Sequence, residues 1–162
     1  MAAAVYYIIA HSAAKSMLFL AANRLREASG HEDTFTALGG AARRAPLAGL
    51  AFMIGAFSLV GIPGLGGFAG KLYLASAGVS LGGWRMAAVL AVLALSTLLN
   101  VAYMLRTLVT LYREKEETNQ STVCRDGFFA VAVSGLIALN LLLGLLGGPI
   151  LRLIEQGIRL FA

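Results

Sequence analysis

The sequence predicts an all-α membrane protein: a polytopic helix bundle of about four crossings, one of them discontinuous, followed by a C-terminal amphipathic helix. Of the 162 residues, 59% are hydrophobic and 13% are charged. An ordinary soluble domain has about 45–50% apolar and about 25% charged residues. A small soluble domain also exposes much of its surface to water. The apolar excess therefore argues against the alternative, a soluble all-helical protein, and favours a single membrane domain over residues 1–162.

The charged residues exclude several functional classes. The formal net charge is +5, but the basic residues do not gather on one polar face with interleaved aromatic rings, so no nucleic-acid partner is expected. Most of them flank apolar runs, as membrane anchors do. The single cysteine, Cys124, excludes an internal disulfide. The expected surroundings are thus a lipid bilayer and other membrane subunits.

The first expected span covers residues 2–22 and contains His11 and Lys15. A cleaved signal peptide is the alternative interpretation. No basic residue precedes this run, and its charges lie inside and after it, which is the reverse of a signal peptide. The polar segment 24–45 follows, in which Asp33 or Thr34 is a candidate cap for a short surface helix.

A discontinuous helix is expected next, beginning near Pro46, a residue suited to a first helical turn. The apolar halves 47–60 and 68–79 are each about 20 Å long at the helical rise, and together they can cross a core of about 30 Å. The residues expected to break the helix are Gly61, Pro63, Gly64, Gly66 and Gly67. Two interfacial helices are the alternative, but neither half has the polar face that such helices need.

The run 84–112 is expected to be a long, tilted span. Trp84, Tyr103 and Tyr112 are candidate aromatic-belt residues. Arg106 lies about two turns from the end of the run, so its side chain can extend to the surface as an anchor. A pathway role is the other interpretation of Arg106.

An uncharged span is expected at 128–146, ended by Gly147-Gly148-Pro149. The tail 150–162 is amphipathic and is expected to lie flat on the membrane surface. The loops 24–45 and 113–126 fall on the same side of the expected topology. Together they contain more basic residues than the segments on the opposite side. The positive-inside rule therefore predicts that both loops are cytoplasmic.

Three ionisable residues lie within the expected spans, away from their ends: His11, Lys15 and Lys71. No Asp or Glu accompanies them there, and each charged lysine at membrane depth costs on the order of 3 kcal/mol or more. His11 and Lys15 are four residues apart, so they share a helix face and can exchange a proton directly or through water. In the alternative interpretation, Lys15 extends to the surface and His11 bonds a neighbouring helix.

Lys71 lies just after the helix break. The carbonyls that end the first half, near Val60 to Ile62, favour a cation, whereas the N-terminus of the second half disfavours one. Small movements of the side chain or of water would then change its affinity for a proton. The alternative is that the break is an ordinary loop and Lys71 an interfacial anchor.

No soluble-enzyme active site is predicted. The glycine-rich run lacks the Gly-Lys-Ser/Thr order of a phosphate loop. No nucleophile lies beside a base, and no cluster has metal-ligand spacing. No catalytic residue, cofactor or metal site is therefore expected.

Several motifs resemble a known family. They are HSAAKSMLFL at 11–20, LGG at 38–40, RAP at 44–46, GIP at 61–63, GFAGK at 67–71 and LLNVAYMLR at 98–106. Their order and spacing are similar to those of the antiporter-like proton-pumping subunits of complex I, the D subunit of Mrp sodium/proton antiporters and membrane subunits of energy-converting hydrogenases.

The resemblance implies a fold of inverted five-helix repeats, of which this chain would be the C-terminal part. It implies that Lys15 is the lysine of the unbroken helix, His11 its relay neighbour and Lys71 the terminal lysine of the broken helix. Tyr7 stands where some members have a second relay histidine. The first repeat, with its Glu–Lys pair, is expected to come from a partner chain, the sequence being a split subunit, a fragment or an expression product.

Two functions are consistent with these features. The first is a proton-translocating subunit, or fragment of one, of a respiratory NADH:quinone oxidoreductase-like complex or an Mrp-type cation/proton antiporter, which moves H⁺ or Na⁺ while redox chemistry occurs elsewhere. The second is a structural membrane module that holds neighbouring subunits and conducts nothing. A stand-alone channel is disfavoured, because four crossings leave the lysine-bearing faces exposed to lipid.

Overall fold

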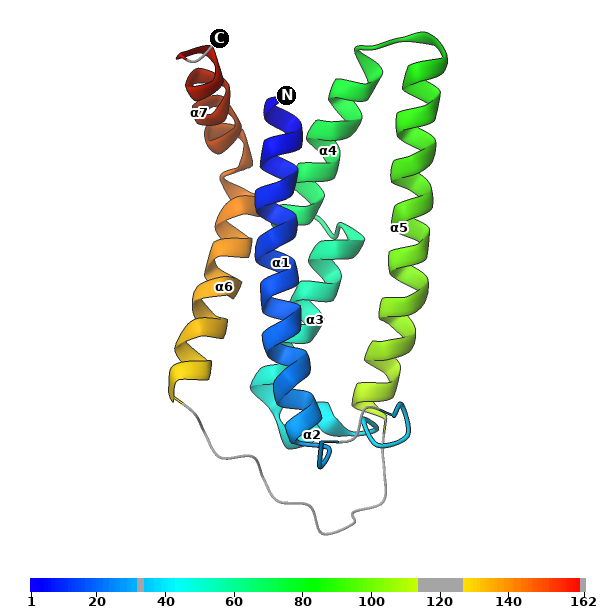
Figure 1. Cartoon of the computed structure of the whole chain (residues 1–162), viewed down its shortest axis with the longest axis vertical. Helices are drawn as coiled ribbons and strands as arrows, with labels where there is room; N and C mark the ends of the chain where they lie inside the picture. Colours follow the sequence, from blue (N-terminus) through cyan, green and yellow to red (C-terminus); the bar gives the residue numbers. More distant parts are fainter. Residues whose placement is uncertain (32–33, 114–126, 161–162) are drawn as a thin grey trace.

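Helices make up nearly all of the computed structural model, which describes residues 1–31, 34–113 and 127–160. Within these ranges the helices are α1 (Ala2–Glu27), α2 (Ala41–Arg44), α3 (Pro46–Val60), α4 (Gly66–Val79), α5 (Gly83–Tyr112), α6 (Gly127–Leu145) and α7 (Gly147–Leu160). Three of them, α1, α5 and α6, are long and apolar enough to cross a membrane, and α3 is a shorter apolar helix. The predicted polytopic membrane bundle is confirmed (Figure 1).

Helix α1 lies at the centre of the bundle, in contact with α3, α4, α6 and α7 (Figure 1). Its buried residues recur every three or four positions: Tyr6, Ala10, Ala13, Ala14, Met17, Leu18, Ala21 and Leu25. Half of these are alanines, and small side chains let helix backbones approach closely in a membrane. The helix that carries His11 and Lys15 is therefore held on several sides by the rest of the bundle.

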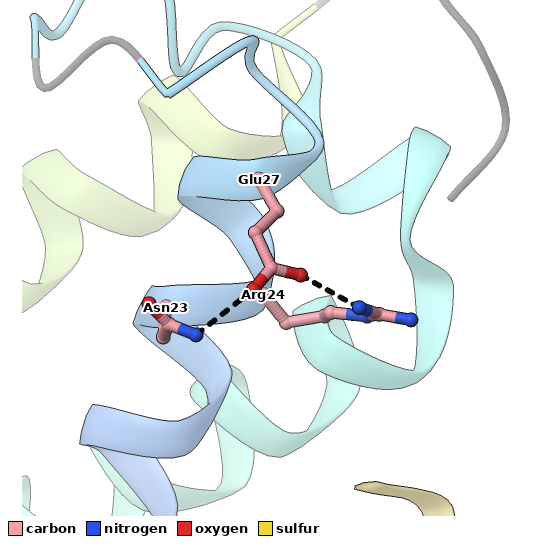
Figure 2. A network of polar contacts seen from close by, with 3 residues as sticks. All are labelled: Asn23, Arg24 and Glu27. Atoms are coloured by element: carbon pink, nitrogen blue, oxygen red, sulfur yellow. Dashed lines mark hydrogen bonds and ion pairs between the residues drawn. The ribbon is translucent and has the colours of Figure 1, made fainter. Parts of the chain in front are cut away.

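Helix α1 continues five residues beyond the expected apolar span. Glu27 accepts hydrogen bonds from Asn23 Nδ2 at 3.1 Å and from the Arg24 guanidinium at 2.6 Å (Figure 2). Side chains three and four residues apart are neighbours on a helix, and such pairs stabilise it. These pairs explain why the helix does not end where its apolar sequence ends.

The segment after α1 contains turns and the four-residue helix α2. Thr34 Oγ1 accepts a hydrogen bond from the Ala37 backbone at 3.3 Å, as a capping side chain does, but the residues after it form turns. Asp33, the other candidate cap, lies outside the described residues. Helix α3 begins at Pro46, as predicted.

Helices α3 and α4 follow each other along one line through the bundle (Figure 1). The interruption comprises residues 61–65, so the predicted discontinuous helix is confirmed. Gly66 and Gly67 were expected within the break and instead form the first turn of α4. The helix begins earlier because the Gly66 and Gly67 N–H groups find acceptors in Asn140 Oδ1 and Ser58 Oγ, at 3.2 and 3.1 Å.

Helix α5 lies at the edge of the bundle, against α3 and α4 (Figure 1). Only Met104 and Leu111 are buried along its 30 residues. The aromatic residues predicted for the membrane belt are exposed: Trp84 by 76%, Tyr103 by 44% and Tyr112 by 39%. Much of the apolar surface of α5 is therefore exposed in the described structure. The loop that follows, 114–126, lies outside the described residues.

Only Leu146 separates α6 from α7. Helix α7 lies beside the first turns of α1, at the end of the bundle that carries the N-terminus (Figure 1), and its position on the membrane surface stays a prediction. Its apolar residues Ile150, Leu151 and Ile154 pack against the cluster formed around Tyr6 and Tyr73. This packing fixes the apolar side of α7 against the bundle, while Arg152, Glu155, Gln156 and Arg159 are exposed, as expected for an amphipathic helix.

Candidate functional site

The end of α3 leaves carbonyl groups available at the helix break. Gly61 has φ of 97° and Gly64 has φ of 92°, a left-handed conformation that glycine adopts without strain. The Gly61 and Ile62 N–H groups both donate to Phe57 O, at 2.9 and 3.0 Å. The last carbonyls of a helix have no partner within it, and here those of Leu59 and Val60 point to a side chain of α4 instead.

That side chain is Lys71. Its Nζ donates hydrogen bonds to Leu59 O at 2.8 Å, Val60 O at 3.1 Å and Thr97 Oγ1 at 2.9 Å. An ammonium group has three N–H donors and no acceptor, so these three contacts match its full capacity. The sequence predicts the carbonyl partners at the end of α3, and the structure confirms this for Val60 and adds Leu59.

Thr97 is a partner of Lys71 that the sequence analysis missed. It belongs to α5, 26 residues away along the chain. Thr97, Asn100 and Met104 recur at i, i+3 and i+7 and lie on the less exposed side of α5. Polar side chains at membrane depth usually face the bundle interior and bond to partners there. The two polar residues on one face of an otherwise apolar helix are therefore the signal that could have identified Thr97.

His11 and Lys15 lie on α1, half-buried, one turn apart. The His11 ring stacks against Tyr7 with the ring centroids 5.6 Å apart. Tyr7, one turn before His11, packs against Gly70, which precedes Lys71 on α4. Across the described residues, no hydrogen bond joins these three side chains to one another. The structure thus brings the three predicted residues into one region of the bundle without connecting them directly.

An open cleft of about 520 Å³ borders Lys71 between α4 and α5. Apart from Lys71 and Thr97, its lining is apolar and includes Val60, Phe68, Leu72, Leu90 and Leu93. Three or more metal-ligating side chains do not gather anywhere in the described part of the chain. The Lys71 amine is thus the titratable group that lines this cleft.

Arg106 lies apart from these residues. Its guanidinium stacks over the Phe35 ring, 5.2 Å from the ring centroid, within the last two turns of α5. Cation–π stacking of this kind stabilises an exposed arginine by about 0.5–1 kcal/mol. The contact favours the anchor interpretation of Arg106 over a pathway role.

We expect Thr97→Val to lower the melting temperature of the protein in detergent, because Lys71 loses one of its three acceptors. A hydrogen bond to a charged group contributes about 1.5–3 kcal/mol. Thr97→Ser keeps the hydroxyl and serves as the control. Equal melting temperatures for the valine and serine variants would show that the Thr97 contact contributes nothing.

Comparison with known proteins places the chain in a family. The model of the family described as "NADH:quinone oxidoreductase/Mrp antiporter, TM" matches residues 1–99. The chain belongs to this family. The matched residues include α1, the helix break and Thr97, so the family assignment rests on the same part of the chain that carries the three candidate relay residues.

Relatives in the NADH:quinone oxidoreductase/Mrp antiporter family extend the match to most of the chain. It is 31% identical to NADH-quinone oxidoreductase subunit N 2 of Sorangium cellulosum over 97% of its own length and 31% of the relative. It is 30% identical to the D subunit of the Na(+)/H(+) antiporter of Alkalihalophilus pseudofirmus, over 93% of its length and 30% of the relative. Formate hydrogenlyase subunit 3 of Escherichia coli is 36% identical over 41% of the chain and 11% of that protein. The chain thus spans about a third of the length of the first two relatives.

Proposed function

We propose that this chain is the C-terminal part of a proton-translocating, antiporter-like membrane subunit, and that Lys71 carries protons at the helix break. The observation that carries the proposal is the amine of Lys71, which is bound by two carbonyls of α3 and by Thr97 of α5. Three segments of the bundle thus meet at one titratable nitrogen. Irregular backbone at membrane depth is tolerated where it lines a water-filled cavity. A lysine at a discontinuous helix can therefore border such a cavity, which suits it to proton exchange.

His11 and Lys15 are proposed as the other relay groups. Both lie on α1, one turn apart, and the turn that contains Tyr7 and precedes His11 packs against Gly70 of α4, next to Lys71. Protonation of one of two neighbouring basic groups disfavours protonation of the other, because like charges repel. This coupling would let a charge change at one end of the array release a proton at the other, through water or through His11.

The transported ion and the parent complex are also part of the proposal. The relative named as a Na(+)/H(+) antiporter subunit supports H⁺ as the transported ion, with Na⁺ as a second candidate. The relative named as an NADH-quinone oxidoreductase subunit supports a respiratory parent complex. We propose that the chain works within a multisubunit membrane complex whose other members supply the first repeat and the driving reaction.

The experiment is reconstitution. The complex is purified through a tag on this chain, its components are identified by mass spectrometry, and it is placed in vesicles with a pH-sensitive dye. Proton movement is expected on addition of NADH and a quinone, or on imposing a Na⁺ gradient. If a fully assembled complex moves no protons with NADH and a quinone and also none with a Na⁺ gradient, the non-conducting structural module is favoured.

We propose that loops 24–45 and 113–126 face the cytoplasm in a bacterial or archaeal inner membrane or its organellar equivalent. Arg24, Arg26, Arg43 and Arg44 support this orientation through the positive-inside rule. Cys124 is the single cysteine and belongs to the second loop. A membrane-impermeant maleimide is expected to label it in inside-out vesicles and not in right-side-out vesicles. The reverse labelling pattern would contradict the orientation.

A further inference from the structure

One face of α6 is built against the helix break. Asn140, Leu143 and Gly144 recur at i, i+3 and i+4 and lie beside residues 64–66. A Cβ atom added to Gly144 would overlap the Gly64 carbonyl, so the two backbones are in direct contact. Tyr6 of α1 donates a hydrogen bond to Leu143 O. This face of α6 therefore touches the break on one side and α1 on the other.

Asn140 makes the specific polar contact on this face. It is fully buried, and its Oδ1 accepts a hydrogen bond from the Gly66 backbone N–H at 3.2 Å. Gly66 is the first residue of α4, and the residue that precedes it, Leu65, has no side chain able to cap the helix. The amide oxygen of α6 therefore takes the place of the N-cap side chain that the sequence around the break lacks.

The orientation of the Asn140 amide follows from this contact, because a backbone N–H needs an oxygen acceptor. The Nδ2 atom is buried and has no hydrogen-bond partner in the described structure. A leucine would fill a similar volume without burying such a group. The acceptor oxygen is thus the property that asparagine supplies at this position and that an apolar residue would not.

We propose that Asn140 is a positioning residue for the helix break, which fixes the start of α4 and thereby holds Lys71 opposite the carbonyls of α3. Lys71 lies five residues after Gly66, so a shift in the first turn of α4 moves its side chain relative to Leu59 and Val60. Asn140 lies beyond the 99 residues that the family model matches. The inference deepens the proposed function and rests on it for the role of Lys71 in proton transport. The contact between Asn140 and Gly66 stands independently of that function.

The test compares Asn140→Leu, which removes the acceptor, with Asn140→Asp, which keeps an oxygen in the same place. Val133→Ala is the matched control, because Val133 is a fully buried residue of the same helix that packs against Met17, Ala21 and Ala51, away from the break. Hydrogen–deuterium exchange of the segment 61–71 is measured by mass spectrometry in the assembled complex. The pH profile of proton transport is measured in vesicles.

Asn140→Leu is expected to raise amide exchange at the break by roughly tenfold, as a lost partner for a buried N–H would, and to shift the pH profile of transport. Asn140→Asp, which keeps an acceptor oxygen, is expected to restore the exchange, and Val133→Ala to change neither quantity. If the leucine variant does not assemble, Asn140→Ala removes the acceptor without added bulk. Wild-type exchange in the leucine or alanine variant, or equal effects of Val133→Ala, would overturn the inference. A wild-type complex that moves no protons would refute the proposed function, while the exchange data would still decide the role of Asn140.

Discussion

Replacing Lys71 with methionine is expected to abolish proton translocation by the assembled complex. Methionine keeps a long, flexible side chain in the cleft between α4 and α5 but cannot bind a proton or donate to Leu59 O, Val60 O and Thr97 Oγ1. A positioned proton-transferring group contributes about 10²- to 10⁴-fold to a rate. We therefore expect the rate of dye-detected proton movement in vesicles to fall by at least about a hundredfold, as that range implies.

Arg85→Met is the matched control for this experiment. It removes one positive charge from an exposed position in the first turn of α5, away from the break. Both variants must assemble to the wild-type level on native gels before their rates are compared. Normal transport by the Lys71→Met complex would remove Lys71 from the relay, whatever the rate of the control.

Gly144→Ala is expected to be among the most destabilising substitutions in the described part of the chain. The added Cβ would overlap the Gly64 carbonyl and approach the Leu65 carbonyl carbon, so backbone rather than a flexible side chain must move. Inserting a methyl group into a packed site typically costs about 1–3 kcal/mol. A lower melting temperature and loss of assembled complex should both follow.

The same helix supplies the control. A Cβ added to Gly135 meets no atom within 4 Å, so Gly135→Ala should be neutral or slightly stabilising. Alanine is the better helix former by roughly 0.5–1 kcal/mol in a helix interior. If Gly144→Ala and Gly135→Ala had the same melting temperature, α6 would not be in contact with the helix break.

The sequence was sufficient to predict most of the helices, because the apolar runs, Pro46 and the glycine-rich break are local signals. Lys71 could be placed opposite the end of α3 for the same reason: the break and the lysine are only a few residues apart. The extension of α1 through Glu27 was not anticipated, since it depends on side-chain pairs rather than on apolar content.

Contacts between distant segments could not be predicted in this way. Thr97 is 26 residues from Lys71, and Asn140 is 74 residues from Gly66. Apolar periodicity does not say which face of α5 or α6 meets the break. Gly66 and Gly67 were expected within the break because their hydrogen-bond acceptors are not adjacent in the sequence. Gly66 donates to Asn140 of α6, and Gly67 donates to Ser58 of α3.

The most direct test of the central claim is to observe the protonation state of the Lys71 amine itself. Nitrogen-15 magnetic resonance of lysine-labelled complex in lipid distinguishes an ammonium from a neutral amine, and the Lys71→Arg variant assigns the signal. During proton movement we expect part of the Lys71 signal to change from ammonium to neutral amine. A signal that remains ammonium in the resting and the working complex would contradict the proposal that this nitrogen passes protons.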